Sequence, residues 1–245
     1  MSAAMLVVPA LAQTGNIRSI VRYRVKPDRA ADFQSAAKEF TGVLKSANYD
    51  KGGTWWVALT GPAEYVLVRH HAKWAELDVT RDPKLKEYGA DLTRISARMQ
   101  QCTESVERIV DEVQPDLSLP RSTEVPKMVR TLLTRVRPDK VDEYMALIKS
   151  EVLPAMKKSG AKNYVVAQTR YGAAGAEFSS STGINSWSDL DGASPLVQAM
   201  GEARYQQFLA KLRPLVRETE RNVYRHLPEL SYLPVAATTT SSGRR

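Results

Sequence analysis

Two adjacent histidines, His70 and His71, end a β-like run and are the side chains best suited to proton transfer near neutral pH. Neighbouring residues of a strand point to opposite faces, so at most one of the two can enter a pocket. His71 shares its face with Tyr65 and Arg69. A neutral imidazole there could take a proton from a phenol, and Tyr65 could donate to a developing oxyanion. We therefore predict His71 and Tyr65 as catalytic and Arg69 as substrate-binding; a surface histidine near a strand end is the plainer alternative.

Two arginines and two tryptophans complete this predicted pocket. Arg22 and Arg24 alternate along one β-like run and share a face, where paired guanidinium groups would suit a carboxylate or a phenolate. Of the adjacent Trp55 and Trp56, one should face inward and could stack on an aromatic ligand. We predict all four as substrate-binding; for the arginines, the alternative is a pair of charges at a solvated rim.

Several kinds of site and partner are not indicated by the sequence. One cysteine and three scattered histidines form no metal-ligand spacing, and no phosphate-binding glycine loop occurs, so we predict neither metal nor cofactor. The 35 Lys and Arg residues exceed the 27 Asp and Glu residues but are dispersed, which argues against nucleic-acid binding. No run of apolar residues is long enough for a membrane-spanning helix.

An internal repeat organises the elements that must position these residues. The sequence RVKPD at 24–28 recurs as RVRPD at 135–139, WAELD at 74–78 recurs as WSDLD at 187–191, and PDLS at 115–118 recurs as PELS at 228–231. The order and nearly constant spacing of the three matches indicate two copies of one unit. We expect Trp74 and Trp187 to be core anchors of their segments.

Each copy has the pattern β-α-β-β-α-β, because β-like runs alternate with helical stripes whose apolar residues repeat every three or four positions. The predicted strands are 17–26, 54–59, 64–71 and 106–113, then 128–137, 164–169, 177–184 and 219–227. The first unit covers 13–113, a linker 114–126, and the second unit 127–234. The tail 235–245 has nothing to bury and is predicted to be disordered.

Residues 1–12, MSAAMLVVPALA, are small and apolar and end in a small-x-small pattern. This pattern predicts a signal peptide, although a basic first region is missing and the apolar run is short. We therefore expect export to the periplasm or the medium, with a cytoplasmic location as the alternative.

The repeated unit, which opens with a strand ending in V-[KR]-P-D before an amphipathic helix, resembles the dimeric α+β barrel superfamily. Within it, the unit is most similar to the antibiotic-biosynthesis-monooxygenase type and to the NIPSNAP and EthD-like groups. The resemblance covers about residues 17–232. It implies an α+β fold in which two tandem ferredoxin-like units form within one chain the barrel that single-unit members build as a dimer.

The resemblance implies cofactor-independent oxidation of a small aromatic or polyketide-like compound. The alternative is a non-catalytic or stress-related protein that binds a small ligand. Haem handling, a third property of the superfamily, is less favoured because no haem-ligand motif surrounds the three histidines. We expect an aromatic or anionic small molecule as partner, and a homo-oligomer is compatible with this interpretation.

Overall fold

The structure is a computed structural model that describes residues 15–78, 82–122 and 124–234. The predicted signal peptide and the predicted tail lie outside the described residues. Within them, eight strands form one closed barrel in the order β1-β3-β2-β8-β5-β7-β6-β4, and all neighbouring strands are antiparallel. The strands are β1 (Ile17–Val25), β2 (Thr54–Ala58), β3 (Glu64–His71), β4 (Thr103–Val113), β5 (Met128–Val136), β6 (Val165–Tyr171), β7 (Ala176–Ile184) and β8 (Val216–His226).

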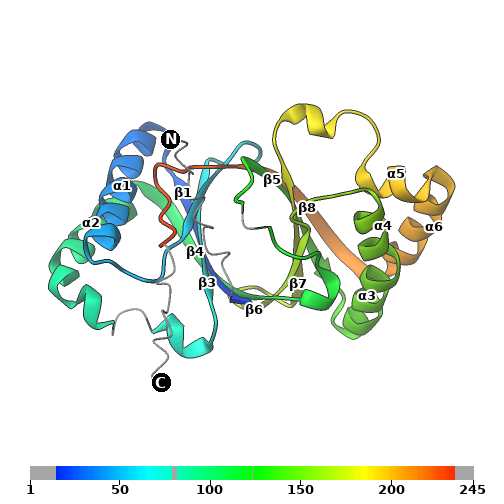
Figure 1. Cartoon of the computed structure of the whole chain (residues 1–245), viewed down its shortest axis with the longest axis horizontal. Helices are drawn as coiled ribbons and strands as arrows, with labels where there is room; N and C mark the ends of the chain where they lie inside the picture. Colours follow the sequence, from blue (N-terminus) through cyan, green and yellow to red (C-terminus); the bar gives the residue numbers. More distant parts are fainter. Residues whose placement is uncertain (1–14, 79–81, 123, 235–245) are drawn as a thin grey trace, which may run out of the picture.

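Helices cover the barrel in two layers on opposite sides (Figure 1). One layer consists of α1 (Ala30–Ser46) and α2 (Gly89–Gln101). The other contains α3 (Val141–Leu147) and α4 (Leu153–Lys158), joined by a π-helical turn at Ile148–Val152, with α5 (Pro195–Met200) and α6 (Glu202–Leu212). The element order β-α-β-β-α-β thus occurs twice along the chain, as an α+β fold with a closed barrel.

Alternation along the strands divides each sheet into a face toward the helices and a face toward the barrel interior. On β1, Tyr23 and Val25 pack in the helix-side core, whereas Arg18, Ile20 and Arg22 line the interior. The reason is the apolar stripe of each helix, which must cover the more apolar face of the strands. The opposite face, which carries both polar and apolar side chains, lines the lumen.

Each helical layer builds its own core against the strands. In the first half, Phe33, Ala36 and Ala37 of α1 pack with Ile95 and Met99 of α2 over the sheet. In the second half, the buried core includes Tyr144, Ile148, Val152, Met156, Phe178 and Phe208. The short stripes predicted from the sequence therefore form the two cores.

The segments that follow β4 and β8 cross between the halves. Leu117 packs in the core of the second half, and Leu227 and Leu230 pack in the core of the first. Each segment is fixed by a serine: the Ser118 hydroxyl accepts a hydrogen bond from the Val166 N–H, and the Ser231 hydroxyl accepts one from the Trp55 N–H, both at 2.9 Å. The exchange is reciprocal, so each core contains side chains from both halves.

The repeated tryptophans differ from expectation. Trp74 and Trp187 are 44% and 50% exposed, because each sits in a short 3-10 helix outside the barrel wall and not beneath a helical layer. Trp74 contacts the exposed ring of Tyr171 edge-on, with 5.7 Å between ring centroids. The prediction that these tryptophans are core anchors was wrong.

Among the described residues, none of the helices is both long enough and apolar enough to traverse a bilayer.

Candidate functional site

The interior of the barrel contains a cavity of about 250 Å³. Strands from both halves line it, and so does the connection between the halves, through Arg121, Ser122 and 124–126. Much of its wall is apolar, formed by Ile20, Trp56, Val66, Val68, Val129 and Leu133. A concave, largely apolar space with a few polar groups is the usual form of a small-molecule site.

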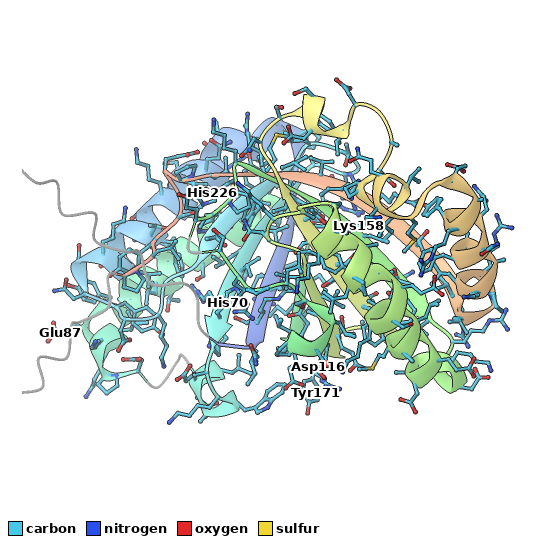
Figure 2. All side chains as sticks on the ribbon, turned by 45° about the vertical axis from the view of Figure 1, so that its right-hand side comes forward. His70, Glu87, Asp116, Lys158, Tyr171 and His226 are labelled. Carbon is cyan, nitrogen blue, oxygen red and sulfur yellow. The ribbon has the colours of Figure 1, made fainter. Side chains whose placement is uncertain are left out.

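His70 is the histidine of β3 that lines the cavity, and Figure 2 labels it on the barrel wall. Its Nδ1 lies 3.1 Å from the carbonyl oxygen of Gly15, which can only accept, and 3.3 Å from Arg121 Nη1, which can only donate. The shorter contact favours a hydrogen on Nδ1 and a lone pair on Nε2. Burial lowers the pKa of His70 to about 3, and the nearby charges of Arg18 and Arg121 act in the same direction. The imidazole is therefore neutral at physiological pH and acts as a hydrogen-bond acceptor.

A buried ion pair braces one side of the cavity. Arg18 donates to both carboxylate oxygens of Asp111, from Nε at 2.7 Å and from Nη2 at 2.5 Å, and Nη2 also donates to the Ser179 hydroxyl at 3.2 Å. Burial alone would lower the pKa of Arg18, but the attraction and hydrogen bonding of Asp111 outweigh it and raise the pKa. The pair joins β1, β4 and β7 and fixes the guanidinium in its charged form.

Glu64, Arg22 and Tyr224 form a second polar group where the cavity continues into a polar hollow of about 190 Å³. The Tyr224 hydroxyl donates to Glu64 Oε1 at 3.3 Å, and Arg22 Nε lies 3.8 Å from the same oxygen. Arg22 also donates to Glu107 at 3.2 Å. Burial raises the pKa of Glu64, helped by the like charges of Glu107 and Glu220 and opposed by Arg22. Glu64 is thus a stronger base than an ordinary surface carboxylate.

Three of the seven residues predicted from the sequence lie in the barrel lumen. Arg22 and Trp56 line the cavity, and Arg24 lines the polar hollow beside it. The centroid of the Trp56 ring lies 5.0 Å from the centroid of the His226 ring, and Trp56 Nε1 donates to the Thr54 hydroxyl at 3.0 Å. The expectation that one of the adjacent tryptophans faces inward agrees with this geometry.

The other four predicted residues lie on the helix-facing side of the sheet. Trp55 and Tyr65 are buried in the first core, where Gln34 donates to the Tyr65 hydroxyl at 2.5 Å. Arg69 and His71 lie farther along the same face of β3. The prediction from the sequence placed Tyr65 and His71 in one pocket with Arg22. The structure does not bring them there, because β1 pairs with β3 so that Arg22 stands opposite Val66.

The polar residues of β3 and β8 that share the lumen with Arg22 were not predicted from the sequence. They are Glu64, His70 and Tyr224, together with Arg18 of β1. The alternation along β3 could have indicated them, because one face of the strand carries Glu64, Val66, Val68 and His70. Among the described residues, no group of three His, Cys, Asp or Glu side chains could hold a metal ion.

Comparison of the chain with models of known protein families and with curated proteins finds no match. Solved structures do match it. A candidate monooxygenase from Lactobacillus acidophilus is 8% identical, with a TM-score of 0.57 over 86% of this chain and 93% of that one. An anthrone oxidase-like protein is 16% identical, with a TM-score of 0.59 over 89% and 94%.

A third match is the chlorite dismutase of Candidatus Nitrospira defluvii, which is 10% identical, with a TM-score of 0.54 over 88% of this chain and 93% of that one. The monooxygenase-type and chlorite dismutase structures belong to the dimeric α+β barrel superfamily. At these identities the likeness concerns the fold, which hosts many functions, and leaves the chemistry to be argued from the site.

Proposed function

We propose that this protein is a cofactor-independent, monooxygenase-like enzyme that oxidises a small aromatic or polyketide-like compound inside the barrel. The observation that carries the proposal is the placement of Glu64, a carboxylate of raised pKa held by Arg22 and Tyr224, at the edge of an apolar cavity of about 250 Å³. The fold that the chain shares with proteins named monooxygenase and anthrone oxidase-like supports it. In the same proposal, the two halves are tandem ferredoxin-like units, as in the NIPSNAP-like type.

The cavity residues suit the first step of such a reaction. Trp56 offers a flat apolar surface for an aromatic ring. Glu64 accepts a proton from a phenol or from a methylene activated by neighbouring rings, and Arg22 and Tyr224 stabilise the negative charge that develops beside it. The free lone pair of His70 Nε2 accepts a hydrogen bond from a substrate hydroxyl.

Electron balance limits the substrates of an enzyme that uses no cofactor. Conversion of an activated methylene to a ketone releases four electrons, which is the number that O₂ requires when one of its atoms enters the ketone and the other leaves as water. The deprotonated substrate thus supplies all the electrons. Simple hydroxylation of a ring would need two further electrons from a reductant, so the proposal favours substrates with an oxidisable methylene flanked by aromatic rings.

The test is oxygen consumption by the purified protein with anthrone as the probe, followed by mass analysis of the product formed under ¹⁸O₂. We expect turnover with one labelled oxygen in the product, and a loss of about 10²-fold or more for Glu64→Gln, the usual range for a lost general base. Glu177→Gln is the matched control. Glu177 stands opposite Arg135 as Glu64 stands opposite Arg24, but it does not line the main cavity.

A second candidate function is ligand binding without catalysis. It is favoured by the pairing of the lumen charges, since Arg18 is neutralised by Asp111, and Arg22 lies between Glu64 and Glu107. Quenching of tryptophan fluorescence by anthrone, without oxygen uptake in the wild-type protein, would refute the oxidation chemistry and support this binding role.

A further inference from the structure

Three buried polar atoms on the helix-facing side of the first half have no hydrogen-bond partner. They are the Tyr49 hydroxyl, Arg69 Nε and His71 Nδ1, and among the described residues no other buried side-chain nitrogen or oxygen atom is in this state. The three belong to one neighbourhood. Arg69 interacts electrostatically with Tyr49, and the largest charge effect on His71 is that of Arg69. The barrel cavity lies on the opposite face of this sheet, so the cluster is separate from it.

Among the residues that the structure describes, Arg69 has no counter-ion. Its guanidinium makes no hydrogen bond or ion pair within the described part of the chain, and its recorded contact is a cation–π interaction, 5.3 Å from the Phe40 ring centroid. Burial lowers the pKa of Arg69, and no carboxylate acts against this effect. A buried charge is costly unless it is paired, so the partly buried guanidinium of Arg69, whose Nε is buried without a partner among the described residues, is suited to bind an anion.

The nearest carboxylates are held elsewhere. Glu76 accepts a hydrogen bond from the Ala72 N–H at 2.9 Å. Asp82 caps the following 3-10 helix through the Lys84 N–H and lies 3.8 Å from Lys51 Nζ, and Asp50 pairs with Lys84 Nζ at 3.2 Å. Glu76 and the two aspartates thus bind other partners. Lys51 adds positive charge near His71.

All three unpartnered atoms can be donors. Ser19 lies 2.8 Å from His71 Nε2 and can donate its hydroxyl hydrogen to that nitrogen, which leaves Nδ1 protonated. The Tyr49 hydroxyl stays protonated, because burial raises its pKa to about 12. Arg69 Nε–H is the third donor. Three donors and an unneutralised positive charge are complementary to an oxyanion.

We propose that Arg69, Tyr49 and His71 form a binding site for a carboxylate-sized oxyanion between β3 and the segment after α1. The fold itself does not require this cluster. His71 pairs with Ile17 at the start of β1, and the corresponding residue of β7, Ile184, pairs with Met128 at the start of β5. Two residues earlier, β7 carries Thr182 in place of Arg69, so the second half builds the same strand with neutral side chains at both of these positions.

The test uses formate as the probe, titrated at constant ionic strength while the melting temperature is followed. We expect a saturable rise for the wild-type protein and a much weaker response for Arg69→Thr, which copies the residue of the second half. Loss of a charge-assisted, paired donor should raise the half-maximal formate concentration about tenfold or more. Arg29→Thr is the control, because Arg29 is half-exposed and pairs with the neighbouring Asp32. An equal response in Arg69→Thr, or no response in the wild type, overturns the proposal.

Tyr49→Phe provides a second test if Arg69→Thr does not fold. Removing an unsatisfied buried hydroxyl should not destabilise the protein without anion, yet it should weaken the formate response several-fold. A Tyr49→Phe protein that responds like the wild type contradicts the site.

Benzoate distinguishes the source of the carboxylate. Saturation by benzoate at a lower concentration than formate indicates an organic acid as the occupant, whereas saturation by formate alone indicates a free small anion.

Discussion

Asp111 neutralises the charge of Arg18, which lines the barrel cavity. Its side chain is 2% exposed, and both of its oxygens accept from Arg18. Asp111→Asn would leave a buried guanidinium without its counter-charge, and we expect a loss of about 3–5 kcal/mol in the free energy of unfolding, measured with urea. Glu107→Gln removes a 52% exposed partner of Arg22 and should cost about 0–1 kcal/mol. Equal losses for the two variants would contradict this account.

The histidines predict how stability depends on pH. Burial lowers the pKa of all three, that of His70 to about 3. Histidines of the unfolded chain titrate near 6.5, so below that pH the unfolded chain binds more protons and the folded protein loses stability as the pH falls. Between pH 7 and 5 we expect His70→Gln to flatten this dependence, by up to about 1.4 kcal/mol per pH unit. An NMR titration of His70 with a midpoint near 6.5 would contradict it.

The choice between His70 and His71 illustrates what the sequence could and could not predict. Alternation correctly placed the two on opposite faces and grouped His71 with Tyr65 and Arg69. Which face meets the lumen depends on the register of β3 against β1, and a shift of one residue exchanges the faces. Polar residues occur on both faces, so neither histidine stood out as the one in the cavity.

At the scale of elements, the sequence indicated the strands well because β-branched residues alternate between clear turn signals. All eight predicted strands overlap observed ones. The pairing of β2 with β8 and of β4 with β6 could not be predicted from the sequence. These pairs join residues more than 50 positions apart through backbone hydrogen bonds, which leave no side-chain pattern. The cavity residues contributed by β8 were missed for this reason.

The turn between β6 and β7 contains two glycines that offer a matched prediction. Gly172 and Gly175 both have positive φ, +91° and +88°, so alanine at either position is strained by about 1–3 kcal/mol. A Cβ at Gly172 would also lie 2.2 Å from the Arg108 carbonyl oxygen on β4, whereas a Cβ at Gly175 meets open space. We expect Gly172→Ala to lower the melting temperature more than Gly175→Ala. Equal effects would mean that the turn can move away from β4.

At the scale of the molecule, two short strand pairings between the halves close the barrel, and we call them seams. The β2–β8 seam pairs Trp56 with His226 and Ala58 with Tyr224, and the β4–β6 seam is reinforced by the Arg170–Glu112 ion pair at 2.7 Å. The cavity is shared across the seams, since Glu64 belongs to the first half and Tyr224 to the second. The candidate site therefore exists only when both halves are joined.

This sharing leads to a prediction for the chain cut after Pro120. The fragments 1–120 and 121–245 keep their exchanged segments, with Leu117 on the first and Leu230 on the second, so each can complete the core of the other. Alone, each fragment would expose two strand edges and the inner face of its sheet, a surface prone to aggregation. We expect co-expressed fragments to purify together with the mass of the uncut chain, measured by light scattering after size exclusion.

Leu117→Ala in the first fragment separates the contribution of the exchanged segment from that of the strand seams. Leu117 is 1% exposed, and its truncation should cost about 2–5 kcal/mol and weaken the pairing of the fragments correspondingly. Leu119, which lies beside it but is only partly buried, is the matched control and should weaken pairing less when changed to alanine. Fragments that stay soluble as separate monomers would show instead that each half folds independently, and the shared lumen would then be a consequence of docking and not a condition of folding.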